Sequence, residues 1–114
     1  MTDTPFLADA MALTDLEDWG SLAEATGEPM QTSGFTLWKG DNGAEAGVWE
    51  CTAGPSHWEL EQNEFVYVLS GSMTITPEGE DSFEVGPGST FVVPVGWKGD
   101  WLIHETLRKL YVLY

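Results

Sequence analysis

Short apolar segments separated by turn residues dominate the pattern of this 114-residue chain. In some segments hydrophobic and polar residues alternate, and in others both faces of the predicted strand are apolar. Gly, Pro, Asn and Ser cluster between the segments. The predicted strands are residues 35–39, 46–52, 57–60, 64–69, 73–76, 82–85, 90–93, 101–104 and 107–114. Roughly eight to ten short strands, with no helix long enough to cross between parallel strands, predict an antiparallel sandwich or barrel.

The N-terminal part of the chain is less regular. We predict that residues 1–34 form an arm that packs on the barrel or on a partner subunit, and that residues 35–114 form the β-barrel domain. Residues 14–19 predict a short helical turn, begun by a Thr or Asp cap. The sequence Ser70-Gly71-Ser72 predicts a hairpin turn between two of the strands.

The charge of the chain narrows the choice of partners. Nineteen acidic residues face four basic ones, which gives a formal charge of −15. Such a surface repels phosphate backbones and anionic lipids, so we expect neither nucleic acid nor membrane as a partner. Cys51 is the single cysteine, which excludes an intrachain disulfide and fits a reducing compartment. Without an apolar leader, the chain is predicted to be cytoplasmic.

Two strings of residues are spaced like known motifs. They are His57-x-Glu59-(x)4-Glu64-(x)6-Gly71 and Gly88-(x)5-Pro94-x-Gly96. The first resembles the first cupin motif, in which two His and a Glu face a barrel interior and bind a divalent metal. The second resembles the start of the second cupin motif.

The wider segment from Trp38 to Tyr114 resembles the small single-domain cupins grouped with the (S)-ureidoglycine aminohydrolase cupin domain, to which the ethanolamine-utilisation cupins are related. This resemblance implies an all-β fold, the cupin jelly-roll β-barrel, here with an N-terminal arm. It also implies a homodimer, and exposed strand edges and a surplus of aromatic residues point the same way.

The sequence departs from the metal-binding pattern at two positions. Glu59 stands where the first motif has its second His, and Gly99 stands where the second motif has its His. His104 has the opposite strand parity and is expected to face away. The remaining candidate ligands are His57, Glu59 and Glu64, for a divalent transition metal such as Mn, Zn, Ni or Fe. The alternative is a polar strand at the barrel rim that binds nothing.

Glu64 is the candidate catalytic residue, because it begins an otherwise apolar strand. A lone buried carboxylate is costly, so Glu64 either pairs with a cation such as Arg108 or Lys109, or is unpaired with a raised pKa suited to a general acid or base. Aromatic residues are expected to line a pocket around it, and the candidates are Trp49, Trp58, Trp101 and Tyr111.

Three functions remain open at this stage. The favoured one is a small-molecule-binding cupin with a degenerate metal site, its pocket centred on Glu64. The first alternative is a metal-dependent aminohydrolase that acts on a small ureide or amine, using His57, Glu59 and Glu64. The second alternative is a non-catalytic accessory or structural barrel. A fold by itself does not decide between them.

Overall fold

The computed structural model describes residues 3–114. Across these residues the chain forms eight strands and one short 3-10 turn, so the all-β prediction is confirmed. The elements are β1 (Glu17–Ser21), β2 (Gln31–Lys39), η1 (Asp41–Gly43), β3 (Glu45–Cys51), β4 (Gly54–Glu59), β5 (Glu64–Pro77), β6 (Phe83–Val85), β7 (Thr90–Val93) and β8 (Lys98–Leu113).

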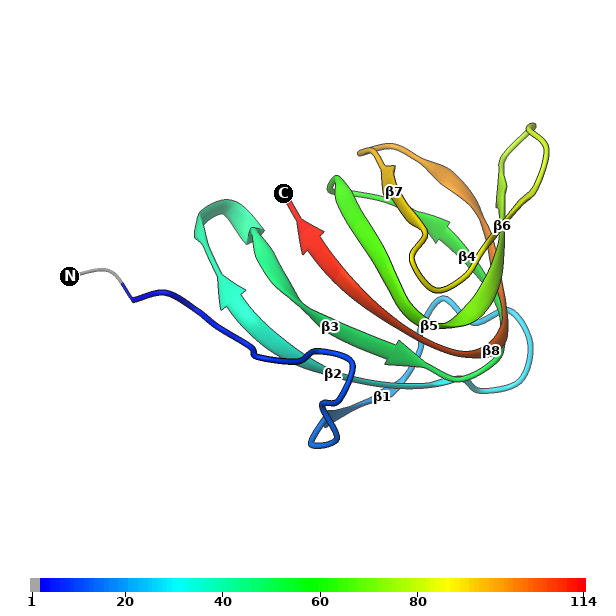
Figure 1. Ribbon diagram of the computed structural model, residues 1–114. Helices are drawn as coiled ribbons and strands as arrows, with labels where there is room; N and C mark the ends of the chain where they lie inside the picture. The colour runs from blue at the N-terminus through cyan, green and yellow to red at the C-terminus, as the bar shows by residue number, and fades with distance from the viewer. Residues whose placement is uncertain (1–2) are drawn as a thin grey trace.

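All strands belong to one antiparallel sheet. Its main path is β1-β2-β3-β8-β5-β6, while β4 pairs with β8 and β7 pairs with β5. Figure 1 shows this sheet rolled up, with β2 and β3 on one side, β4, β6 and β7 on the other, and the long strands β5 and β8 running between them. Because β8 pairs with β3, β4 and β5, it joins both sides of the barrel.

The predicted hairpin at Ser70-Gly71-Ser72 is wrong, because β5 continues through it from Glu64 to Pro77. The register between β5 and β8 shifts there, so the two strands bend together. Gly71 has φ +86°, and a Cβ at this position would lie 2.2 Å from the carbonyl oxygen of Thr106. The glycine therefore marks a close approach of two bent strands, not the end of one.

The predicted helical turn over residues 14–19 is also wrong, since residues from Glu17 onward form β1 and pair with β2. The predicted boundary between arm and barrel, at residue 34, falls inside β2. Nothing among residues 3–114 forms a helix long and apolar enough to cross a membrane.

The two faces of β8 separate the core from the outer surface. Trp101, Ile103, Leu107 and Tyr111 point inward and join the buried side chains of β5. On the outer face of β5 and of the strands paired with it, large apolar side chains are exposed to solvent. They are Phe65 and Tyr67 of β5, Val92 of β7 and Val112 of β8, with exposed fractions of 37–49%.

Candidate functional site

Two adjacent cations on β8 point to opposite sides of the sheet, because side chains alternate along a strand. Arg108 lies on the outer face and Lys109 on the inner face, where only 4% of the lysine is exposed. β3 places Trp49 opposite Lys109, and β5 places Val68 on its other side. The register of three strands therefore carries a positive charge into the barrel interior.

The partner of this charge is Glu64, the first residue of β5, which is 5% exposed. Lys109 Nζ donates a hydrogen bond of 2.6 Å to Glu64 Oε2. The same ammonium lies 4.4 Å from the ring centroid of Trp49 and 4.6 Å from that of Trp101. Of the two states that the sequence left open for Glu64, the structure shows the paired one. The carboxylate is held by a neutralising ammonium and the ammonium by two aromatic faces.

A cavity of about 260 Å³ opens beside this pair. Its walls are largely aromatic and aliphatic, with a few polar groups converging on it, as in many small-molecule sites. The lining residues are Trp19, Glu45, Trp49, Trp58, Leu60, Glu64, Lys109, Tyr111 and Leu113.

Two glycines make room for the rings that shape the cavity. A Cβ on Gly34 would lie 2.3 Å from the Trp19 ring, and one on Gly47 would lie 2.9 Å from the Tyr111 hydroxyl oxygen. Both positions therefore need a residue without a side chain if the rings are to lie against the sheet.

Glu45 and Tyr111 form the second polar contact of the cavity. The Tyr111 hydroxyl donates a hydrogen bond to Glu45 Oε2. Burial raises the pKa of Tyr111, and the hydrogen bond and negative charge of Glu45 raise it further. The phenol therefore stays protonated at neutral pH and acts as a donor.

Cys51 lies on the same inner face of β3 as Trp49 and is fully buried. Burial raises the pKa of its thiol to about 11, although the positive charge of Lys109 acts in the opposite direction. A thiol that keeps its proton at neutral pH is a poor nucleophile, so Cys51 is a packing residue here.

The structure does not bring the three predicted metal ligands together. Strand β4 turns Trp58 inward and His57 and Glu59 outward, so both lie on the outer surface. There His57 Nδ1 lies 2.7 Å from Asp100 Oδ1, and Glu59 Oε1 lies 3.4 Å from Lys98 Nζ. Glu64 is inside with Lys109. Within residues 3–114 no group of three or more His, Cys, Asp or Glu side chains is arranged to hold a metal ion. These donors do not fit a metal centre.

The other predicted pocket residues occupy two places. Trp49, Trp58 and Tyr111 line the cavity together with Glu64. Trp101 lies behind them, with its ring centroid 4.6 Å from that of Trp58. It is fully buried and contacts the ammonium of Lys109, not the cavity itself.

Sequence reasoning missed five residues that line the cavity, which are Trp19, Glu45, Leu60, Lys109 and Leu113. Lys109 was considered as a partner of Glu64, but not as a wall of the pocket. Its inner position could have been found by extending the alternation of β8 from Trp101 through Tyr111. Glu45 and Trp19 gave no such signal. Glu45 is the first residue of β3, and Trp19 lies where the register between β1 and β2 shifts, so simple alternation does not place either side chain.

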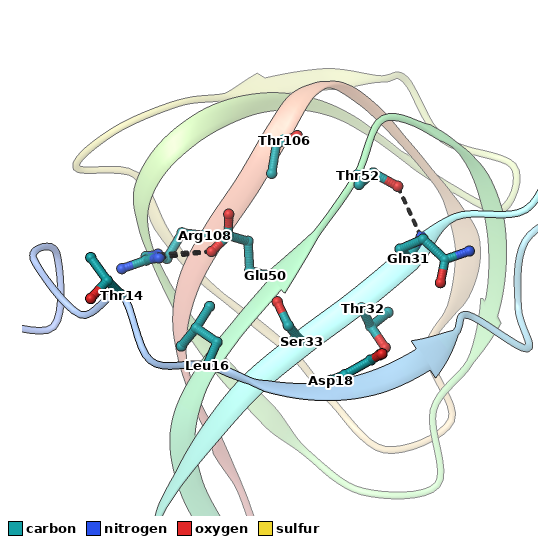
Figure 2. Close-up of a pocket in the computed structure, with 10 residues that line it drawn as sticks. All are labelled: Thr14, Leu16, Asp18, Gln31, Thr32, Ser33, Glu50, Thr52, Thr106 and Arg108. Atoms are coloured by element: carbon teal, nitrogen blue, oxygen red, sulfur yellow. Dashed lines mark hydrogen bonds and ion pairs between the residues drawn. The ribbon is translucent and has the colours of Figure 1, made fainter.

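A second hollow, of about 610 Å³, lies on the outer side of the sheet, under the N-terminal arm (Figure 2). Arg108 stands at its edge and donates from Nε and Nη2 to Glu50 Oε2. Its Nη1 donates to the backbone oxygens of Ala10, Met11 and Leu13. The guanidinium thus ties the arm to the barrel, and its donors are already engaged by the chain itself.

Comparison with known proteins agrees with this architecture. A protein of unknown function from Pseudomonas syringae superposes with a TM-score of 0.82 at 21% identity, and the match covers 93% of this chain and 46% of that protein. This chain therefore spans about half the length of that relative. The EutQ protein of Clostridium difficile superposes with a TM-score of 0.64 at 22% identity, over 75% of this chain and 68% of that one.

A protein from Thermotoga maritima superposes with a TM-score of 0.57 at 28% identity, over 59% of this chain and 76% of that one. A search of curated proteins gave no match to this chain. The structural matches establish the cupin jelly-roll fold. The family model for the EutQ-like cupin domain matches residues 38–111, which is most of the barrel. The chain therefore belongs to the family of EutQ-like cupin domains.

Proposed function

We propose that this cupin domain binds a small organic molecule in the cavity beside the Glu64–Lys109 pair. One observation carries the proposal: the barrel interior holds a cavity of about 260 Å³ with aromatic walls and a buried ion pair at its side. An apolar recess with a few convergent polar groups is the usual form of a small-molecule site. A barrel with a purely structural role would have its own side chains in this space.

In this role Glu64 is a fixed binding group. Its carboxylate is already neutralised by Lys109, with both side chains 5–7% exposed. One oxygen accepts the lysine's hydrogen bond, which leaves the other to accept one from a ligand. The Tyr111 hydroxyl and Glu45 provide a second polar point on the cavity wall.

The metal-dependent aminohydrolase is the weaker candidate. Its reaction would use a metal as a Lewis acid held by His57, Glu59 and Glu64, but the first two lie outside the barrel and are paired with other residues. We expect that adding Mn²⁺, Zn²⁺ or Ni²⁺ together with a small ureide will release no ammonia above the rate without protein.

The binding proposal is tested by thermal unfolding in the presence of a panel of small amines, alcohols, carboxylates and ureides. A ligand at a hundred times its dissociation constant stabilises the folded state by about 2.7 kcal/mol, enough to raise the melting temperature by several degrees. The matched control is Leu60→Trp, which fills the cavity from its wall and should abolish the shift. If no member of the panel moves the melting temperature of the original protein, the proposal fails.

A further inference from the structure

The residues that line the cavity include one more carboxylate than cation. Glu45, Glu64 and Lys109 line it, and Lys109 balances Glu64. Glu45 takes part in none of the ion pairs found within residues 3–114. Its partner is the Tyr111 hydroxyl, which is neutral. Lys39 is the register partner of Glu45 on β2, but it forms none of these ion pairs and does not line the cavity. Within the cavity, the Glu45 carboxylate therefore has no cation against it.

The walls around this carboxylate suit a positive charge as well. Trp19, Trp49, Trp58 and Tyr111 line the cavity, and the faces of such rings attract cations within about 6 Å. The protein already uses this attraction, because the ammonium of Lys109 lies 4.4 Å from the Trp49 ring centroid. A second cation would meet the same kind of wall with Glu45 to balance it.

Resting on the proposed binding function, we propose that the ligand of this cavity is a small organic ammonium ion. Its charged group lies against the aromatic wall and Glu45, and its uncharged part lies against Leu60 and Leu113. The volume of about 260 Å³ limits the ligand to a few carbon atoms beyond the ammonium group. Anions are disfavoured, because Lys109 is already engaged and the chain carries a formal charge of −15.

Choline and its uncharged carbon analogue 3,3-dimethylbutan-1-ol test the charge requirement directly, since the two molecules have nearly the same shape. A carboxylate of the same shape, 3,3-dimethylbutanoate, tests the sign. Binding is measured by calorimetry and by quenching of tryptophan fluorescence. We expect choline to bind at least tenfold more tightly than the alcohol, and the carboxylate to bind more weakly than both.

Glu45→Gln should reduce the preference for choline over the alcohol to less than threefold, because it removes the unbalanced charge while keeping an acceptor for Tyr111. The matched control Glu59→Gln removes a carboxylate on the outer surface and should leave the preference unchanged. If Glu45→Gln does not fold, Trp19→Leu provides a second variant, which should weaken choline more than the alcohol.

Equal binding of choline and the alcohol, or tighter binding of the carboxylate, would overturn the cation preference and leave the binding function in place. Failure of choline and of every amine in the panel to bind, while alcohols, carboxylates or ureides shift the melting temperature, would have the same meaning. If neither choline nor any panel member binds, both proposals fall.

Discussion

The buried Glu64–Lys109 pair allows a sharp test, by replacing Lys109 with methionine. Methionine has a similar length but no charge, so Lys109→Met leaves the Glu64 carboxylate buried without a cation. Removing one partner of a buried ion pair costs about 3–5 kcal/mol. The lost contacts with the rings of Trp49 and Trp101 add to this. A domain of this size has about 5–15 kcal/mol in total, so the variant should lose a large part of its stability.

Two comparisons separate the charge effect from lost packing. The double variant Glu64→Gln with Lys109→Met removes both charges and should recover at least 2 kcal/mol relative to Lys109→Met, since no buried charge remains. The exposed pair Glu59–Lys98, with exposed fractions of 65% and 53%, is the control. Lys98→Met should cost less than about 1 kcal/mol.

The assay is urea unfolding at pH 7, followed by tryptophan fluorescence and circular dichroism. A free energy of unfolding for Lys109→Met within 1 kcal/mol of that of the original protein at pH 7 would refute the expected cost of the unpaired charge. A double variant as unstable as Lys109→Met would refute it as well, because the loss of stability would then come from packing alone.

Other regions of the barrel give three further expectations. Gly71→Ala should cost about 2–4 kcal/mol in urea unfolding, because it adds a backbone clash to a strained φ, whereas Gly88→Ala, with a similar φ but open space, should cost only about 1 kcal/mol. Stability should fall as pH rises from 9 to 11, because folded Cys51 keeps its proton, with a pKa raised from 9.0 to about 11, while the unfolded chain loses it. The loss is about 3 kcal/mol at most, and an alkaline unfolding curve unchanged by Cys51→Ala would contradict this. A homodimer remains a prediction, and light scattering should give twice the 12.5 kDa of the chain. Phe65→Glu, on the exposed apolar surface formed with Tyr67, Val92 and Val112, should halve this mass, whereas Val95→Glu should not.

The sequence predicts strand alternation well, but the face of β4 assigned to the barrel interior was the wrong one. His57 and Glu59 do share a face, as alternation requires, yet that face is the outer one. Trp58 takes the interior because a large ring has more apolar area to bury than the two polar side chains. The resemblance to a metal-binding motif favoured the other face of β4, and the apolar area of the side chains was the better guide.

The position of Glu64 was easier to predict, because few cations were available to balance it. The chain has four Lys and Arg, and two of them follow each other on the last strand. Alternation then sends one inward and one outward. The predicted breaks between residues 69 and 73 and between residues 104 and 107 were wrong, because β5 and β8 are continuous there. Gly71 has the local features of a turn, but pairing with a neighbouring strand along its whole length overrides them.

The place of β8 in the sheet has a consequence for how the protein is made. β8 pairs with β3, β4 and β5 and supplies Trp101, Lys109 and Tyr111 to the interior. During synthesis, the earlier strands therefore emerge from the ribosome before the strand that joins them exists. We expect stalled nascent chains that lack residues 98–113 to be digested readily by protease, and protection to appear in one step once this segment has emerged. Non-local pairing of this kind is also typical of slow folding, so we expect the apolar faces of the earlier strands to be exposed to aggregation until β8 is in place.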